Sequence, residues 1–167
     1  MAAVSSKPAA GKKAKKFDSL EQEAYLQLWR TYDRLKLLED ELFGRYELSA
    51  QQYNALRLLR SVQPQTMPTS ALGARLISRA PDMTRLLDKL EERGLVRRER
   101  RAENRRVVEV GITPDGLTLL DALANEVRDC HERQLGHLGA KGLRALITDL
   151  REAGRPHEDA EPWPGKD

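Results

Sequence analysis

The sequence predicts a mainly α-helical fold that carries one small β-hairpin. Apolar residues recur every three or four positions along most of the chain, which is typical of amphipathic helices. Two short segments, 95–101 and 106–112, lack this period, and in the second one apolar residues alternate with others as in a strand. The polar residues 102–105 between them suit a hairpin tip.

The first element is a long amphipathic helix over residues 17–44, whose apolar face is widened by Tyr25 and Trp29. Such a broad face indicates packing on more than one neighbour, including a second subunit. The preceding residues 1–16 hold five lysines and no acid. They lack an apolar period, so we expect a disordered basic tail there.

Three helices are expected in the first half of the middle region. Ser49 and Gln52 have the spacing of a capping box, which predicts a helix over 50–61. After a proline-containing loop, Thr69 is expected to cap a short helix. A tight turn at 77–79 then leads to a helix over 79–93, with Pro81 in its first turn and Gly94 just past its end.

The C-terminal part is expected to be helical as well. Thr113 and Pro114 supply an N-cap and a first-turn proline for a helix that continues to Gly136. A last helix is expected over 140–153. The remaining residues, 154–167, are rich in proline and acids and predict a disordered tail.

Composition excludes several classes of protein. With 33% charged and 40% hydrophobic residues, the composition is typical of a soluble protein. No apolar run reaches the roughly 20 residues needed to cross a membrane. The lysine-rich start lacks the apolar block of a secretory signal, so we expect a cytoplasmic protein. A single cysteine, Cys130, excludes an internal disulfide. We find no catalytic pair, metal cluster or phosphate loop, and therefore expect no cofactor and no enzyme.

The distribution of charge points to nucleic acid. The net charge is +3, of which the first 16 residues contribute +5, so DNA affinity in the folded part depends on where its arginines lie. Seven of them fall between positions 93 and 106, against two glutamates: Arg93, Arg97, Arg98, Arg100, Arg101, Arg105 and Arg106. A solvated charged hairpin is the alternative interpretation.

The helix over 79–93 has two distinct faces. At 100° per residue its leucines form a core face, and the opposite side presents Ser78, Asp82, Arg85 and Lys89. Arg85 suits a guanine edge in a major groove, and Lys89 suits a phosphate. Ser78 suits either a phosphate or a base, and Asp82 can accept from a cytosine amine or support Arg85. The alternative is an ordinary solvated helix surface.

The hairpin supplies a second DNA contact. Its tip residues Arg105 and Arg106 are suited to the narrow, electronegative minor groove of A·T-rich DNA. Its strand arginines, among them Arg98 and Arg100, are expected to bind flanking phosphates.

Three runs, 70–76, 83–96 and 104–116, resemble the MarR family of bacterial, multiple-antibiotic-resistance-type regulators. The resemblance spans residues 20 to 150 and implies a winged helix-turn-helix within one domain over 17–153. In it, a DNA-binding lobe covers 49–112, and helices 17–44 and 113–153 form a two-fold dimer. It places Arg85 in the major groove and Arg106 in the minor groove, and Ser70, Arg79 and Thr84 complete the predicted contacts. Asn104 departs from the family, which usually has an aspartate there.

The resemblance also implies a small aromatic or anionic effector, with Tyr25, Trp29 and Tyr53 as its contacts; ordinary core packing is the alternative for each. Cys130 is expected to pack in the core rather than to sense oxidants. We therefore expect a homodimeric, ligand-responsive repressor that binds a pseudo-palindromic operator in double-stranded DNA. The alternative is a protein-interaction adaptor whose winged helix no longer binds DNA.

Overall fold

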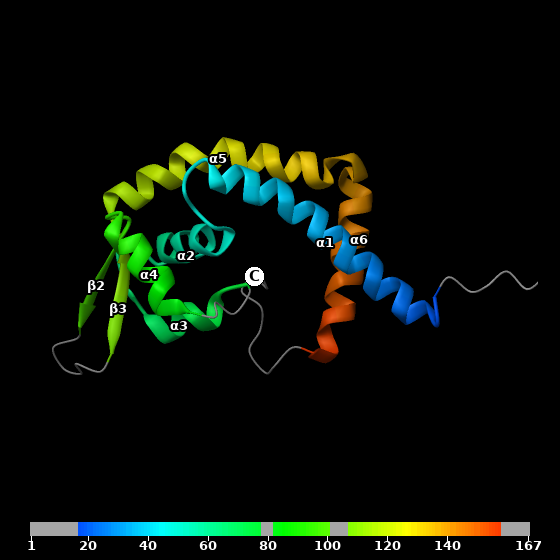
Figure 1. The fold of residues 1–167 in the computed structure, drawn as a ribbon, viewed down its shortest axis with the longest axis horizontal. Helices are drawn as coiled ribbons and strands as arrows, with labels where there is room; N and C mark the ends of the chain where they lie inside the picture. The colour runs from blue at the N-terminus through cyan, green and yellow to red at the C-terminus, as the bar shows by residue number, and fades with distance from the viewer. Residues whose placement is uncertain (1–16, 78–81, 101–106, 158–167) are drawn as a thin grey trace, which may run out of the picture. The chain divides into compact units, whose positions relative to one another are not determined.

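Helices make up most of the described chain, with a small sheet among them (Figure 1). The computed structural model describes residues 17–77, 82–100 and 107–157. Residues 1–16, 78–81, 101–106 and 158–167 lie outside the described residues. They include the predicted basic tail, the predicted hairpin tip and most of the acidic tail predicted over 154–167. The elements are, in order, α1 (Leu20–Gly44), α2 (Ala50–Ser61), β1 (Met67–Pro68), α3 (Thr69–Arg75), α4 (Met83–Glu92), β2 (Val96–Arg100), β3 (Val108–Ile112), α5 (Pro114–Leu135), the 3-10 turn η1 (Gly136–Leu138), α6 (Gly139–Gly154) and the 3-10 turn η2 (Arg155–His157).

The chain divides into two units, one ending at Leu35 and one beginning at Lys36. The first contains the N-terminal part of α1, whose large apolar side chains are mostly exposed. The second holds a hydrophobic core to which α2, α3, α4, α5 and the sheet all contribute. The largest fully buried side chains of this core are Leu56, Leu59, Leu72, Leu87, Leu90, Val110 and Leu123.

The predicted helix starts at Ser49 and Thr113 are confirmed. The Ser49 hydroxyl accepts from the Gln52 backbone N–H at 3.2 Å, and the Gln52 side chain accepts from the Ser49 N–H at 2.8 Å, which satisfies two donors at the start of α2. Thr113 caps α5 by accepting from the N–H of Gly116 at 3.1 Å. Both helix starts could be predicted from the sequence because each capping side chain bonds a backbone N–H group only three residues away.

The sheet differs from the predicted hairpin. It has three antiparallel strands in the order β1-β3-β2, because Met67 and Pro68 pair with Val110 and Glu109. The predicted loop therefore contains a short edge strand. β3 lies in the middle of the sheet, and its residue Glu109 is buried.

Thr69 does not cap α3 as predicted. The N-cap position is Pro68, with no side-chain cap, and the Thr69 hydroxyl instead donates to the carbonyl of Val108 at 3.0 Å. The hydroxyl therefore ties α3 to β3. Hydrogen bonding to a neighbouring strand has replaced the local cap that the sequence favoured.

Two other boundaries also differ. The helix expected over 79–93 begins at Met83 after an Asp82 N-cap, and Pro81 lies outside the described residues. At the other end, Gly154 completes α6 and Arg155–His157 form a 3-10 turn, where a disordered tail was expected from residue 154. The predicted helix start at residue 79 and the predicted start of the tail at residue 154 therefore each lie a few residues too early in the sequence.

Candidate nucleic-acid interface

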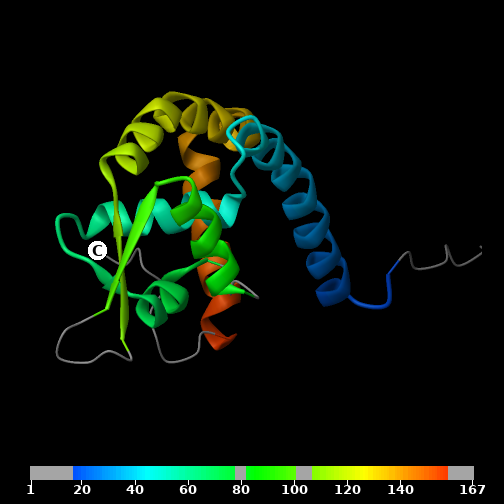
Figure 2. The ribbon, with the colours of Figure 1, turned by 60° about the vertical axis from the view of Figure 1, so that its left-hand side comes forward.

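One face of α4 is buried and the opposite face is open to solvent, as the sequence predicted. Leu86, Leu87 and Leu90 are buried in the core, whereas Thr84, Arg85 and Lys89 are exposed. The helix lies beside the hairpin strands β2 and β3 (Figures 1 and 2). Packing through the leucines thus holds the three polar side chains outward on a rigid element.

Asp82 stabilises the start of α4. Its Oδ1 accepts from the backbone N–H of Arg85 at 2.9 Å and caps α4. A carboxylate at a helix N-terminus is favoured by the helix dipole as well as by the hydrogen bond. The side chain of Asp82 therefore fixes the backbone at Arg85, while the Arg85 guanidinium remains exposed.

The structure brings the start of α2 to the same surface, which the sequence analysis missed. A surface hollow beside α4 is lined by residues of both helices: Ser49, Gln51, Gln52, Asp82, Arg85, Leu86 and Lys89. The two segments are at least 30 positions apart in the sequence, and no local pattern predicts that they lie close together. The polar surface around Arg85 and Lys89 therefore extends beyond α4 itself.

Ser70 and the turn after α3 complete the helix-turn-helix part of the prediction. Ser70 is exposed in the first turn of α3, and the bond from Thr69 to Val108 fixes that turn against β3. Ser78 and Arg79 lie outside the described residues. The predicted helix-turn-helix contacts that are described are all exposed: Ser70, Asp82, Thr84, Arg85 and Lys89.

Arg98 is placed differently from the phosphate contact that was predicted. Its guanidinium donates to Oδ1 of Asp88 at 2.6 Å and, from Nε, to Oε2 of Glu91 at 2.8 Å. The hydrogen bonds that Arg98 donates to these carboxylates, chiefly to Glu91, raise its pKa. Only 26% of its side chain is exposed. Arg98 therefore fastens β2 to α4 and neutralises two carboxylates beside the exposed face of the helix.

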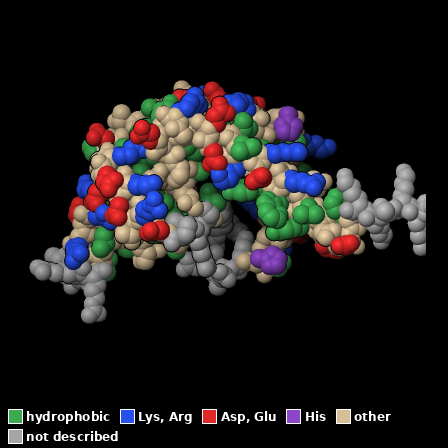
Figure 3. Space-filling view, in the orientation of Figure 1, with side chains coloured by type: hydrophobic (Ala, Val, Ile, Leu, Met, Phe, Trp, Pro, Cys, Tyr) green, Lys and Arg blue, Asp and Glu red, His purple; other side chains and the backbone are tan. Residues whose placement is uncertain are grey.

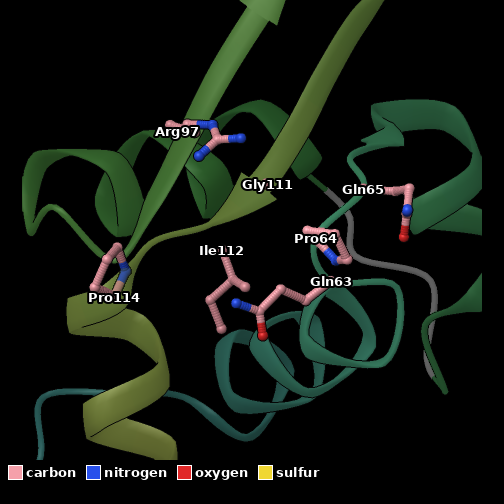
Figure 4. A pocket seen from close by; sticks show the side chains of 7 residues that line it. All are labelled: Gln63, Pro64, Gln65, Arg97, Gly111, Ile112 and Pro114. Carbon is pink, nitrogen blue, oxygen red and sulfur yellow. The ribbon is translucent and has the colours of Figure 1, made fainter.

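The remaining β2 arginines occupy two environments. Arg97 pairs with Glu99 at 2.7 Å on the face of the sheet opposite Arg98, since alternate residues of a strand point to opposite sides. There it lines a hollow with Gly111 and the loop residues 63–65 (Figure 4). Arg100 is exposed at the end of β2, next to the hairpin tip. The predicted tip residues Arg105 and Arg106 lie outside the described residues.

Charge is mixed on one face of the molecule. On the face drawn in Figure 3, acidic and basic side chains lie among one another. A surface of this kind provides no broad field to attract a polyanion.

A separate hollow between α2 and α5 contains Tyr53, one of the predicted ligand contacts. Its lining is aromatic, basic and apolar: Tyr53, Arg57, Arg60, Ser61, Leu120 and Ala124. The Tyr53 ring stacks on Phe43 with 4.6 Å between centroids, and burial raises the pKa of its phenol. Arg60 is held by Asp121 at 2.8 Å. The hollow thus combines a ring with a cationic rim.

The other two predicted ligand contacts lie in the unit that ends at Leu35. Tyr25 and Trp29 contact each other, with ring centroids 6.1 Å apart, and their exposed fractions are 63% and 60%. They are not core residues of the described chain, so the alternative of ordinary core packing does not describe them. Their role as ligand contacts stays a prediction.

Cys130 is buried, as predicted, and burial raises the pKa of its thiol. A thiol that holds its proton is a poor nucleophile, which favours the packing role. Among the described residues, no group of three or more histidine, cysteine or acidic side chains is placed to hold a metal ion. No helix in that part of the chain is long and apolar enough to span a membrane.

Comparison with known proteins gives a consistent result. A family model described as the MarR family matches residues 48–108, which include α3, α4 and β2. The HTH-type transcriptional regulator PecS of Dickeya dadantii (strain 3937) is 31% identical over 101 residues, which is 58% of this chain. The match spans 61% of the length of PecS.

Solved structures extend the likeness over most of the chain. A MarR transcription factor from Planctomyces limnophilus is 62% identical, with a TM-score of 0.66, and the match covers 81% of this chain and 98% of that one. A mutant of MarR from E. coli, solved with operator DNA, has a TM-score of 0.71 at 21% identity, covering 81% of this chain and 99% of its own. At that identity the second likeness concerns the fold alone. These relatives are transcription factors and regulators, not enzymes.

Proposed function

Because this chain belongs to the MarR family of DNA-binding transcription regulators, we propose that it binds a pseudo-palindromic operator in double-stranded DNA as a homodimer. In this proposal it is a ligand-responsive repressor that acts in the cytoplasm. Each protomer reads one half-site, and the two half-sites lie about one helical turn apart.

The observation that carries this proposal is the exposed polar face of α4. Thr84, Arg85 and Lys89 project from a helix whose other side is fixed in the core. Arg85 donates to a guanine edge, Lys89 binds a phosphate, and Ser70 binds a phosphate from the start of α3. This arrangement is suited to a helix that lies in a major groove.

The hairpin supplies the second contact in the proposal. In the proposal Arg100 binds a flanking phosphate, and the predicted tip residues Arg105 and Arg106 enter the minor groove. Ser78, Arg79 and Asp82 remain proposed contacts at the start of α4. Arg98 supports them indirectly, since its pairs with Asp88 and Glu91 remove negative charge that would repel phosphate.

Homodimerisation is supported by exposed apolar side chains on the long helices. On α1 they include Leu28 at 50% and Tyr32 at 59% exposure, and on α6 Ile147 at 47%. Exposed large apolar side chains that cluster on a surface mark interaction sites. Replacing Leu28 by Asp should give a monomer in analytical ultracentrifugation. Arg30→Asp, which changes a residue about 200° around the same helix from Leu28, should leave the dimer intact, and a Leu28→Asp dimer would contradict this part of the proposal.

The proposed effector is a small aromatic anion bound in the Tyr53 hollow. The Tyr53 ring offers a stacking surface, and the Arg57 guanidinium offers a charge partner on its rim. Benzoate serves as a probe. We expect it to weaken operator binding by the wild type but not by Arg57→Ala, and equal release from both proteins would contradict this site. Tyr25 and Trp29 remain proposed contacts.

Selection of bound duplexes from a random DNA pool tests the central proposal. The expected result is a two-fold symmetric consensus, with affinity that falls steeply with salt because phosphate contacts release counterions. Recovery of no consensus, together with salt-independent binding, would contradict it. That result would favour an adaptor whose winged helix does not bind DNA.

A further inference from the structure

A polar contact joins the end of α4 to the loop between α1 and α2. Arg93, which caps α4 at its C-terminus, donates from Nη1 to the carbonyl of Glu47 at 2.8 Å. It donates from Nη2 to the carbonyl of Tyr46 at 3.0 Å. A planar guanidinium that holds two acceptors has little rotational freedom left. The end of α4 is therefore tied to main-chain atoms of this loop.

The loop is itself fastened to α5. The hydroxyl of Tyr46 donates to Oε1 of Glu126, and Arg45 pairs with the other carboxylate oxygen of Glu126 at 2.9 Å. The hydrogen bond to Glu126 raises the pKa of the Tyr46 phenol. Tyr46 is thus held at both ends, by α5 through its hydroxyl and by α4 through its carbonyl.

The backbone of the loop is closely constrained as well. Glu47 has a φ of 53°, in the left-handed region that costs energy for a residue other than glycine. Its N–H donates to the carbonyl of Gly44 at 3.1 Å, and the N–H of Leu48 donates to Phe43 at 3.0 Å. An unfavourable conformation persists where surrounding contacts enforce it. The two carbonyls that Arg93 binds therefore sit at fixed positions.

The turn after α4 is held from a second side. The Thr113 hydroxyl donates to the carbonyl of Gly94 at 2.6 Å, and the Thr113 N–H donates to the carbonyl of Leu95 at 3.1 Å. Thr113 is the N-cap of α5. The turn at 93–95 is consequently where α4, the α1–α2 loop and the start of α5 are bonded together.

We infer that Arg93 is a positioning residue for operator recognition: with Tyr46 it fixes α4 to the end of α1 and to α5, and so sets the half-site spacing that the dimer accepts. The inference rests on the proposed binding of DNA by a homodimer. Two copies of α4 keep one separation only if each is fixed to the helices that join the protomers. Half-sites one turn apart lie about 34–36 Å from each other, so a rotation of either α4 changes the accepted spacing.

A series of operators with altered spacing tests this inference. Binding is measured for the operator selected by the wild type and for duplexes with one base pair added or removed between half-sites. Arg93→Ala should lose about ten-fold in affinity for the selected operator and little for the altered ones. Its preference for one spacing should therefore fall. Arg128→Ala, which removes an exposed arginine from α5, is the control and should keep the wild-type preference.

The salt dependence separates positioning from direct contact with DNA. If Arg93 bound a phosphate, its loss from both protomers would reduce the slope of log affinity against log salt by about 2. Positioning predicts an unchanged slope. Arg93→Lys keeps the charge but not the planar fork, so positioning predicts that it does not restore the wild-type spacing preference.

Tyr46→Phe gives an independent variant, because it removes the bond to Glu126 without changing the charge or the carbonyl that Arg93 binds. We expect it to relax the spacing preference in the same direction as Arg93→Ala, with less than additive effects in the double variant. Thermal unfolding confirms that each variant is folded. A wild-type spacing preference in Arg93→Ala, or a reduced salt slope, would overturn the inference alone. A wild type that selects no operator would contradict the proposed function as well.

Discussion

Nη2 of Arg98 in β2 lies 2.6 Å from Oδ1 of Asp88 in α4. The same guanidinium also binds Glu91, so a strand of the hairpin and the proposed recognition helix are joined by one side chain. Two acidic residues next to the exposed face of α4 are thereby neutralised. This relationship explains how a helix with several carboxylates can face a polyanion.

Replacing Arg98 by Ala should weaken both stability and DNA binding. Loss of the charged hydrogen bonds is expected to lower the free energy of unfolding by about 1 kcal/mol, measured by urea denaturation. Affinity for any duplex should fall several-fold because Asp88 and Glu91 then repel phosphate. Restored affinity on adding Asp88→Asn and Glu91→Gln would support this indirect role. If affinity stays low in that triple variant, Arg98 binds phosphate directly.

Lys89 should contribute to affinity without contributing to sequence preference. It is exposed on α4, and an ammonium group binds phosphate as a point charge. In Lys89→Ala we expect similar losses for operator and unrelated duplexes, and a salt slope reduced by about 2 for one contact in each protomer. Lys141→Ala on α6 is the control. A selective loss of operator binding in titrations would instead assign base recognition to Lys89.

Gly116 should tolerate no side chain. A Cβ at this position would overlap the carbonyl oxygen of Leu95 and approach Cγ1 of Ile112 to 2.8 Å. We expect Gly116→Ala to lower the free energy of unfolding by roughly 1–3 kcal/mol. Gly73→Ala, where the nearest atom is Cγ of Met83 at 3.6 Å, should be neutral or stabilising. Equal unfolding midpoints for the two variants would contradict the close approach of α5 to the α4–β2 turn.

The raised pKa of Cys130 predicts a specific pH dependence of stability. Burial keeps the thiol protonated in the folded state to a higher pH than in the unfolded chain. The associated stabilisation is complete below the thiol pKa of the unfolded chain and is lost as pH rises through the folded pKa. Urea unfolding at pH 7.5 and pH 9.5 should therefore show a larger decrease for the wild type than for Cys130→Ala. Identical decreases would place the thiol in water.

Helix starts and faces were predictable because their signals are local. Ser49 with Gln52, and Thr113 with its following proline, satisfy backbone groups within one turn. The helical spacing of the leucines in α4 predicted which face of this helix is buried. The open side carrying Arg85 and Lys89 followed from the same periodicity.

The parts that were missed depend on contacts distant in sequence. Met67 forms a strand only because Val110 lies opposite it. The Thr69 hydroxyl donates to the carbonyl of Val108 and does not cap α3. Arg98 was predicted as a phosphate ligand from arginine density alone. No pattern within β2 indicates that Arg98 is paired with Asp88 and Glu91 of α4.

Base recognition by Arg85 is the central claim, and titrations of Arg85→Ala with two duplexes test it most directly. One duplex carries the operator selected by the wild type, and the other has the same length and composition in scrambled order. A bidentate contact with guanine contributes about 1–3 kcal/mol of discrimination, so operator affinity should fall ten-fold or more while the affinity for the scrambled duplex changes far less. Arg128→Ala provides the control for loss of charge. An Arg85→Ala protein that still prefers the operator as strongly as the wild type would contradict the account.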